Sequence, residues 1–299
     1  MNTNLKLLYI LATDGIVLPA LWYSKKNKRL SLSIYVHGSG SSSIINNPDY
    51  FNKLAKELAS KEVDFLAFNN RGAGYYTKLR HKSPTSQEVQ FGGMAFDRIN
   101  HSPYDIEGVL KWAKSIGYED IYLIGHSTGA NKLCYYLSTG KVPNTIKRVY
   151  LLAGGDDIGL QRGKLSNPEK VADILNAAIK EGKIDELVPP TLFPGQHPIS
   201  YGSFYELITR GSDYDIFPFE RIVKQDDDSD LFGHFKSIQI PITAIYGSDD
   251  QGTIIPVKDA VSILERLNRL SRGYIITGAG HNFVDHEDQL IDEIVTNLG

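Results

Sequence analysis

An apolar run at 121–124 ends abruptly in the sequence GHSTG (125–129), and a segment with helical character follows at 130–137. A buried strand, a sharp turn and a helix in this order predict a serine displayed at a strand-to-helix turn. Glycines on both sides suit a strained turn because they lack a Cβ atom. Ser127 would then lie at a helix N-terminus, where free backbone N–H groups and the helix dipole stabilise negative charge.

The match to G-x-S-x-G is weak evidence by itself, because the chain contains 27 glycines and such a turn can arise by chance. The alternative is a glycine-rich turn without chemistry. A serine hydroxyl is barely ionised at neutral pH, so a nucleophilic serine needs a base and a carboxylate that orients the base. The hypothesis for Ser127 therefore depends on partners elsewhere in the chain.

The size and charge of the chain argue against several classes of function. Its 299 residues suffice for one large α/β domain or two ordinary domains with a substantial core. A hydrophobic content of 41%, a charged content of 22% and a net charge of −3 are those of an ordinary soluble protein. This balance gives no reason to expect nucleic acid or an anionic membrane surface as a partner.

Neither the cysteine content nor the N-terminal sequence indicates a secreted or membrane protein. The single cysteine, Cys134, cannot form an internal disulfide or a cysteine metal cluster, and its apolar neighbours favour core packing. The apolar run at 7–12 is too short for a signal peptide and leads into Asp14-Gly15, a hairpin signal. No stretch approaches the roughly 18 consecutive apolar residues of a membrane helix. We expect a cytoplasmic protein that does not bind membranes.

Strands and helices alternate along most of the chain. Two antiparallel strands joined by the Asp14-Gly15 turn are expected first, and a basic tip at 25–29 leads to a third strand. The expected strands cover 5–13, 16–24, 30–38, 63–70, 121–127, 146–155, 242–247 and 273–278, and the expected helices cover 48–61, 104–116, 129–139, 256–268 and 285–298. Such alternation predicts the α/β class with a mostly parallel sheet.

The alternation stops for about eighty residues after the sixth strand. Residues 157–236 contain a helical piece at 167–182, proline-rich turns at 188–198 and many aromatic side chains. This composition is typical of a packed cap inserted into the fold, and not of a disordered linker. We therefore expect a core of residues 1–156 and 237–299 and a largely helical cap of residues 157–236.

An acidic run, Asp226-Asp227-Asp228 with Asp230, lies near the end of this insertion. It lacks the spacing and the glycine of a calcium loop, so a solvated loop is the simpler prediction. One cysteine and scattered histidines offer no obvious metal set, and we expect no metal or organic cofactor.

Candidate partners for Ser127 follow two later strands. Asp249 and Asp250 come after the strand at 242–247, and His281 comes after the strand at 273–278. Because the carboxyl ends of parallel strands meet at one edge of a sheet, we expect serine, acid and histidine to converge there. Their order along the chain, serine, acid and then histidine, is that of a serine hydrolase triad.

The chain resembles the α/β-hydrolase superfamily over nearly its whole length outside the insertion. The segments HGSG (37–40), FNNRGAG (68–74), GHSTG, YGSDD (246–250) and GAGHNF (278–283) occur in the order of that family. The resemblance implies an eight-stranded, mostly parallel sheet with antiparallel N-terminal strands, helices on both faces and a cap after strand 6. The segment at 199–220 is also similar to hydrolases related to the fungal siderophore-ester hydrolases, but we infer no substrate from that.

The resemblance also implies roles for individual residues. Ser127 would be the nucleophile and His281 the general base, and the family spacing G-x-x-D selects Asp250, with Asp249 as the near alternative. The oxyanion hole would consist of the backbone N–H groups of Ser39 and Thr128.

Several other polar residues compete for these roles or flank them. Asp156, at the end of the sixth strand, is a rival for the acid, and His286, expected inside the last helix, is a rival for the base. His37 and His126 suit loop-shaping hydrogen bonds better than proton transfer. Arg71 lies where the family often has D-x-R-G, but Asn69 replaces the usual acid, and we expect Arg71 to be structural.

These residues predict a serine hydrolase that cleaves a carboxylic ester or a related acyl compound through an acyl-enzyme, EC 3.1.1 in class. The partner would be a fairly apolar or aromatic small molecule, because aromatic side chains are frequent in the expected cap. An acyltransferase or an aminopeptidase or amidase with the same triad is the alternative enzyme. A small-molecule receptor on a hydrolase fold is the alternative from another class. The sequence names neither the substrate nor the oligomeric state.

Overall fold

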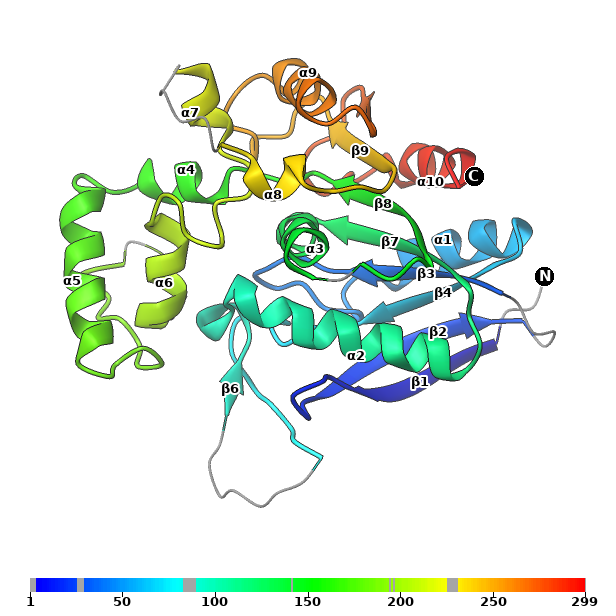
Figure 1. The fold of residues 1–299 in the computed structure, drawn as a ribbon, viewed down its shortest axis with the longest axis horizontal. Helices are drawn as coiled ribbons and strands as arrows, with labels where there is room; N and C mark the ends of the chain where they lie inside the picture. Colours follow the sequence, from blue (N-terminus) through cyan, green and yellow to red (C-terminus); the bar gives the residue numbers. More distant parts are fainter. Residues whose placement is uncertain are drawn as a thin grey trace.

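Eight strands of the described residues form one sheet, in the order β1-β2-β4-β3-β7-β8-β9-β10 (Figure 1). The computed structural model describes residues 4–25, 30–82, 90–140, 142–193, 195, 197–224 and 231–298. The strands of this sheet are β1 (Asn4–Leu11), β2 (Val17–Ser24), β3 (Ser31–Val36), β4 (Val63–Phe68), β7 (Asp120–His126), β8 (Ile146–Leu152), β9 (Ile242–Gly247) and β10 (Ser271–Ile276). β2 is antiparallel to both neighbours, and all other pairs are parallel. The predicted sheet is confirmed.

Side chains of the central strands alternate between two cores. In β4, Phe65 lies in the core on one face and Leu66 in the core on the other. In β7, Leu123 and Ile124 divide in the same way. Because both faces are covered, these strands appear in the sequence as short continuous apolar runs and not as polar-apolar alternation.

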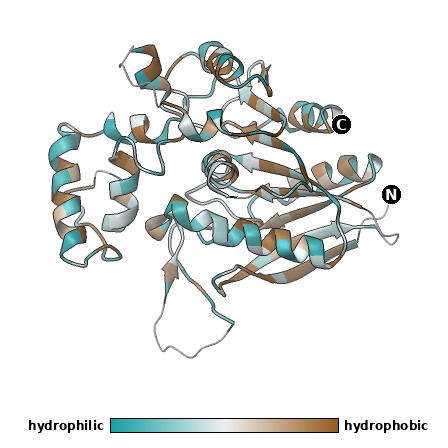
Figure 2. Ribbon diagram, in the orientation of Figure 1, coloured by the Kyte–Doolittle hydropathy of each residue, from teal (hydrophilic) through white to brown (hydrophobic). Residues whose placement is uncertain are grey.

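Helices cover both faces of the sheet, as predicted (Figure 1). The core on one face contains side chains of α1 (Pro48–Ser60) and α10 (Glu287–Thr296), and the core on the other contains those of α2 (Ser102–Ser115), α3 (Thr128–Thr139) and α9 (Val257–Leu267). Figure 2 shows hydrophobic residues along the central strands and polar residues on the outer turns of the helices. In α1, the predicted stripe of Phe51, Leu54 and Leu58 is buried.

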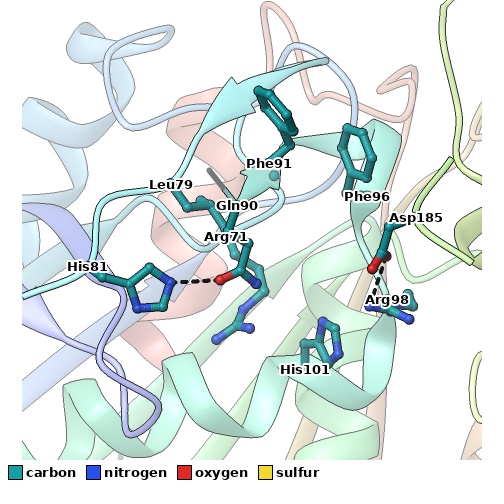
Figure 3. Close-up of a pocket in the computed structure, with 10 residues that line it drawn as sticks. Arg71, Leu79, His81, Gln90, Phe91, Phe96, Arg98, His101 and Asp185 are labelled. Atoms are coloured by element: carbon teal, nitrogen blue, oxygen red, sulfur yellow. Dashed lines mark hydrogen bonds and ion pairs between the residues drawn. The ribbon is translucent and has the colours of Figure 1, made fainter. Parts of the chain in front are cut away.

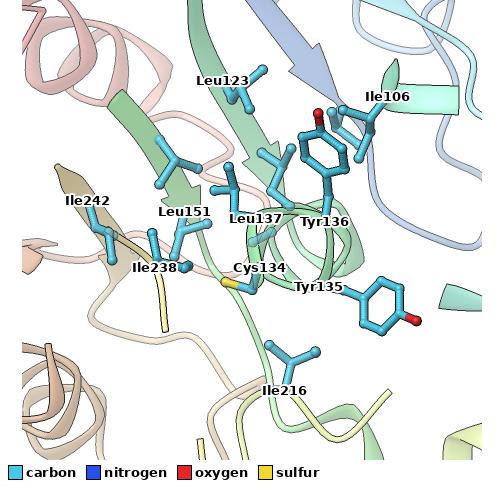
Figure 4. Close-up of a cluster of buried hydrophobic side chains, with 14 of the residues drawn as sticks. Ile106, Leu123, Cys134, Tyr135, Tyr136, Leu137, Leu151, Ile216, Ile238 and Ile242 are labelled. Carbon is cyan, nitrogen blue, oxygen red and sulfur yellow. The ribbon is translucent and has the colours of Figure 1, made fainter. Parts of the chain in front are cut away.

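The helix α3 is buried over residues 128–137, which makes it a rigid support for the turn that precedes it. Figure 4 shows Cys134 and Leu137 of α3 among side chains of β7, β8 and the segments at 216 and 238. The predicted core role of Cys134 is confirmed, because this cysteine is free and fully buried. Burial also raises the pKa of its thiol.

Residues between β8 and β9 form α4 (Asp157–Arg162), α5 (Pro168–Lys180), α6 (Tyr201–Ile208), α7 (Phe219–Val223) and α8 (Gly233–Lys236). The helices α5 and α6 stand beside the sheet and enclose a small core of their own, which includes Leu175 and Phe204 (Figure 1). The later aromatic side chains Phe217, Phe219 and Phe235 instead belong to the core of the main sheet. Among the described residues of this insertion, those between 165 and 208 thus have a core of their own, whereas these later aromatic side chains pack against the main sheet.

The short elements between β4 and α2 were not predicted from the sequence. They are β5 (Thr77–Lys78), β6 (Phe91–Gly92), and the 3-10 turns η1 (Met94–Phe96) and η2 (Ile99–His101). Two or three residues are too few to display a strand or helix period. β5 and β6 pair antiparallel in a small separate ladder.

Two predictions lie outside the described residues. These are the solvated loop at Asp226–Asp230 and most of the basic tip at 25–29. Within the described ranges, no helix has the length and apolar character needed to cross a membrane.

Candidate active site

Ser127 occupies a strained turn between β7 and α3. Its backbone angles are φ 56° and ψ −129°, and it is the residue immediately before the first turn of α3. A non-glycine residue with positive φ is uncommon and marks strain that the surrounding structure must hold. The Ser127 N–H donates to the carbonyl oxygen of Leu152 at 2.8 Å, which ties the turn to β8.

The two glycines of GHSTG are required by close backbone approach. A Cβ atom on Gly125 would lie 2.5 Å from the carbonyl oxygen of Gly129, and one on Gly129 would lie 2.1 Å from the carbonyl oxygen of Val36. Both distances are far below van der Waals contact. These glycines let α3 start directly against β3 and β7.

The structure brings Ser127, His281 and Asp250 together in a line. His281 Nε2 lies 2.8 Å from Ser127 Oγ, and His281 Nδ1 lies 2.9 Å from Asp250 Oδ1. His281 follows β10 and Asp250 follows β9, so all three residues come from the carboxyl edge of the parallel strands. With Nδ1–H donating to the carboxylate, Nε2 is the acceptor for the serine hydroxyl.

Asp250, and not Asp249, contacts the histidine. The Asp250 side chain is fully buried, and its Oδ1 also accepts the Gly252 N–H at 2.7 Å. Asp249 is exposed and accepts from the Ser248 hydroxyl at 2.8 Å. Of the two neighbouring acids, only Asp250 is therefore placed to orient His281.

The environment raises the pKa of His281 above the ordinary value of 6.5. Burial favours the neutral imidazole and lowers the pKa, but the hydrogen bond and negative charge of Asp250, with a smaller contribution from Asp157, outweigh it. His281 is thus more basic than a free histidine, as a proton acceptor for serine should be.

Asp156, the alternative candidate for the acid, bonds to backbone N–H groups and not to His281. It caps α4, with its Oδ1 accepting the Gly159 N–H at 2.8 Å, while its Oδ2 accepts the Glu220 N–H at 2.9 Å. Burial raises its pKa to about 6. Both oxygens serve backbone groups of the insertion, and Asp156 has no contact with His281 among the described residues.

The prediction that His286 lies inside the last helix is wrong. α10 begins at Glu287, because Phe283 and Asp285 have φ values of 54° and 64°, which a helix cannot contain. The His286 ring bonds to the carbonyl oxygen of Val284 at 3.0 Å, and no contact to Ser127 or Asp250 occurs within the described chain.

His126 shapes the loop that carries His281. Its Nε2 lies 2.9 Å from the carbonyl oxygen of His281, so this nitrogen carries the proton and donates. Burial and the nearby His281 lower the pKa of His126 to about 4. It stays neutral at physiological pH and holds the backbone of its neighbour, as the sequence suggested.

Of the two residues expected to form the oxyanion hole, Thr128 directly follows Ser127, and Ser39 follows a glycine that lies against it. Thr128 is the buried first residue of α3, and half-buried Ser39 follows Gly38. A Cβ atom on Gly38 would lie 2.9 Å from Ser127 Cβ and 3.3 Å from Ser127 Oγ. The loop after β3 thus lies directly against the serine.

One acid near the triad was missed by the sequence analysis. The Asp157 carboxylate accepts from Asn131 Nδ2 at 3.2 Å and from Thr128 Oγ1 at 3.5 Å. Burial raises its pKa to about 6, although the nearby His281 lowers it. Its position next to Asp156, just after the carboxyl edge of β8, was the only signal, and nothing in the sequence separated the two acids.

Arg71 is structural, as expected. Its Nε and Nη2 donate to Asp105 Oδ1 at 3.1 and 2.7 Å, its own N–H donates to Asp105 Oδ2, and Nη2 also reaches Asp14 at 2.8 Å. Asp14 lies in the β1–β2 turn and Asp105 in α2. The buried guanidinium therefore joins the segment after β4 to two other parts of the core.

Two pockets lie near these residues without including the triad. One, of about 250 Å³, is lined by His37, His126 and Phe283, together with residues of α1 and α10. The other, of about 500 Å³, is lined by residues including Arg71, Phe91 and Arg98. Figure 3 shows its ion pair between Arg98 and Asp185, which links the insertion to the segment before α2.

No group of three or more metal-binding side chains gathers within the part of the chain that the structure describes. The arrangement of Ser127, His281 and Asp250 can activate a hydroxyl for attack on a carbonyl carbon.

Solved structures of other proteins share this fold at low sequence identity. Est1E from Butyrivibrio proteoclasticus is 14% identical with a TM-score of 0.60, over 97% of this chain and 96% of its own. The Pyrococcus furiosus esterase Pf2001 is 18% identical with a TM-score of 0.56, over 99% and 94%. An alpha-beta serine hydrolase homologue from Coxiella burnetii is 16% identical with a TM-score of 0.57, over 100% and 99%. These likenesses show the α/β-hydrolase fold.

Among curated proteins, no sequence matches the chain significantly. Residues 86–298, more than half of the chain, match the model of a family described as a protein of unknown function, DUF1749. The chain therefore belongs to the DUF1749 family and has the α/β-hydrolase fold.

Proposed function

We propose that the protein is a serine hydrolase that cleaves a carboxylic ester of a small molecule. The observation that carries this proposal is the line of hydrogen bonds from Ser127 Oγ to His281 Nε2, 2.8 Å, and from His281 Nδ1 to Asp250 Oδ1, 2.9 Å. A merely structural serine would not need a strained backbone, a basic histidine and a buried carboxylate behind it. The esterases among the solved structures of this fold support the same class.

The reaction follows from these positions. His281 Nε2 takes the Ser127 proton while Oγ attacks the carbonyl carbon, and Asp250 stabilises the imidazolium. The backbone N–H groups of Ser39 and Thr128 are the proposed donors to the oxyanion. Collapse expels the alcohol, which takes the proton from His281. Water, activated by the same histidine, then releases the acid from Ser127.

The helices α4, α5 and α6 are the proposed wall of the substrate site. α4 starts at Asp157, which contacts Thr128 beside the nucleophile. Est1E, which shares the fold, has been seen with ferulic acid, so aromatic acyl esters belong in a substrate screen beside alkyl esters. We propose a small acyl compound as the partner, and no cofactor is needed for this chemistry.

A fluorophosphonate probe tests the proposal before the substrate is known. The wild-type protein should be labelled at Ser127, as found by peptide mass spectrometry, and Ser127→Ala should not be labelled. Asp249→Asn serves as the matched control and should label at the wild-type rate. A folded wild-type protein that stays unlabelled would contradict the enzyme, and ligand binding without turnover would then favour a receptor.

A second candidate, cleavage of aminoacyl esters or amides, is favoured by Asp157. A carboxylate beside Thr128 that also influences the pKa of His281 is close enough to attract an ammonium group on a bound substrate. The comparison uses two esters of equal shape, the alanyl and the isobutyryl p-nitrophenyl ester. A preference for the charged alanyl ester that disappears in Asp157→Asn supports this candidate. Equal kcat/KM values for the two esters would exclude it.

A further inference from the structure

A buried lysine lies on the helix that begins at the nucleophile. Lys132, in α3, has a side chain that is only 1% exposed. Its Nζ donates to Asp97 Oδ2 at 2.6 Å and to Asn70 Oδ1 at 3.1 Å. An ammonium group away from water is costly unless it is paired and hydrogen-bonded. The proposed ester hydrolysis does not by itself explain why this charge is placed here.

Asn70 carries the connection from Lys132 to the loop after β3. Lysine can only donate, so the Asn70 oxygen faces Lys132, and the same oxygen accepts the Gly72 N–H at 3.0 Å. This fixes the orientation of the amide. Its Nδ2 therefore points the other way and donates to the carbonyl oxygen of His37 at 3.1 Å.

His37 is held in one tautomer by its neighbours. Its Nε2 lies 3.1 Å from the backbone nitrogen of Asn70, an N–H that can only donate, so Nε2 is unprotonated. The proton is then on Nδ1, which donates to the carbonyl oxygen of Gly38 at 2.7 Å. Burial, and after it the charge of Lys132, lower the pKa of His37 to about 4, so the ring stays neutral.

The bond to Gly38 determines the direction of the next N–H group. In a trans peptide the carbonyl of one residue and the N–H of the next point in opposite directions. No cis peptide bond occurs within the described ranges. Because the Gly38 carbonyl points to the His37 ring, the Ser39 N–H points away from it. Gly38 itself lies against Ser127.

We propose that Lys132 is a positioning residue for the oxyanion hole: through Asn70 and His37 it sets the direction of the Ser39 N–H relative to Ser127. This inference rests on the proposed esterase function. Lys132 lies in α3 and Ser127 immediately precedes this helix, so one rigid helix determines the place of the proposed nucleophile and of the ammonium group that holds the loop. The ion pair with Asp97 compensates the buried charge of Lys132. The hydrogen bond to Asn70 fixes the Asn70 amide and, through it, the position of the loop after β3.

The variant Lys132→Met tests this, because methionine is similar in size and removes both hydrogen bonds. We expect kcat on a p-nitrophenyl ester to fall at least tenfold with KM within twofold of wild type, since an oxyanion donor acts in the transition state. In an NMR titration of the imidazoles, the His37 pKa should rise from the wild-type value, because a positive neighbour has been removed.

A double variant separates positioning from charge balance. The variant Lys132→Met/Asp97→Asn removes both buried charges. It should regain much of the stability lost in Lys132→Met, while kcat stays low. If Lys132→Met does not fold, this double variant is measured in its place. Asn268→Ala is the stability control, because Asn268 is a buried amide that bonds to the carbonyl oxygens of Phe235 and Ile238 before β10, at the edge of the sheet opposite the triad. Its kcat should match wild type.

The outcomes distinguish this inference from the proposed function. A wild-type protein that neither labels at Ser127 nor hydrolyses esters defeats the esterase proposal itself. An active wild type with unchanged kcat in Lys132→Met, or full recovery of kcat in the double variant, overturns the positioning role. A Ser39 backbone amide resonance that does not move in Lys132→Met, in the same NMR experiments, overturns the connection through Asn70.

Discussion

The Oδ1 atom of Asp250 accepts hydrogen bonds from His281 and from the Gly252 N–H, whereas its Oδ2 atom is buried without a hydrogen-bond partner among the described residues. His281 is therefore the side chain that the negative charge of Asp250 stabilises most directly. Burial alone would make His281 less basic than a free imidazole, and Asp250 reverses that tendency. At the scale of single residues, the basicity of the proposed catalytic base thus depends on one carboxylate.

The variant Asp250→Asn should therefore change the pH profile as well as the rate. In wild type, kcat/KM should fall on acidification around a pKa above 6.5, because His281 must be neutral to act as base. Without the carboxylate, burial dominates and this acidic limb should move below 6.5, with kcat lower by about 10³–10⁴-fold. Profiles of kcat/KM from pH 5 to 9 measure both effects.

Asp249→Asn is the matched control for this prediction and should keep the wild-type profile, because the Asp249 side chain is exposed and bonds to Ser248. An acidic limb that stays in place in Asp250→Asn would contradict the role of Asp250. So would a larger loss of kcat in Asp249→Asn.

At the scale of elements, the turn between β7 and α3 depends on how closely α3 approaches β3. The backbone of Gly129 passes the carbonyl of Val36 with no room for a side chain. This contact brings the start of α3, and with it Ser127, next to the loop after β3 that carries Gly38 and Ser39. The proposed nucleophile and oxyanion donors are adjacent because these two elements touch.

Gly129→Ala should destabilise the protein by at least about 2 kcal/mol, because the added methyl group forces the start of α3 away from β3. Urea unfolding followed by fluorescence measures the difference. Gly233→Ala, at the start of α8, is the control, since a Cβ atom there meets nothing within 4 Å, and it should be nearly neutral. Equal stability of the two variants would contradict the close approach.

Much of the sheet, and the convergence of Ser127, Asp250 and His281, could be predicted from the sequence, because buried strands and amphipathic helices leave strong periodic signals. The order of Ser127, Asp250 and His281 at strand ends was sufficient to place them at one edge. The start of α10 was predicted two residues early because the positive φ angles at Phe283 and Asp285 have no sequence signal in non-glycine residues. Asp157 and Lys132 were missed because the roles proposed for them rest on tertiary contacts with Thr128, Asn70 and Asp97.

At the scale of the whole molecule, polar contacts join the unit of α5 and α6 to the core, beside the apolar packing of Leu207 against both. Ser200 donates its N–H to the carbonyl oxygen of Ala95 at 2.7 Å, and Glu206 Oε2 accepts the Ile99 N–H at 3.0 Å. Arg98 pairs with Asp185 at 3.2 Å. All these partners on the core side lie between β6 and α2, next to Asp97, so this attachment lies beside the hydrogen-bond network of Lys132 that is proposed to position the Ser39 N–H.

The ionisation of Glu206 should lower the stability of the folded protein, because the charged carboxylate is buried. Burial raises its pKa to about 7, so the folded protein binds its proton more tightly than the unfolded chain, whose glutamate has a pKa near 4.3. The stabilising effect of protonation is fully present below pH 4.3 and is lost as the pH rises through 7. Glu206→Gln should therefore gain stability relative to wild type between pH 5 and pH 8, as measured by urea unfolding at both values.

Glu186→Gln, an exposed glutamate of the same insertion, is the control and should show no such trend. A stability difference between Glu206→Gln and wild type that stays constant or shrinks with rising pH would show that Glu206 is not held in its protonated form.

Mass spectrometry of the enzyme quenched during turnover of a p-nitrophenyl ester tests whether Ser127 forms an acyl-enzyme. A mass increase equal to the acyl group should appear on the peptide that contains Ser127 and should be absent in Ser127→Ala, which should also lose hydrolysis. Hydrolysis that continues in Ser127→Ala, or turnover by wild type with the acyl group on another residue, would contradict the proposed mechanism.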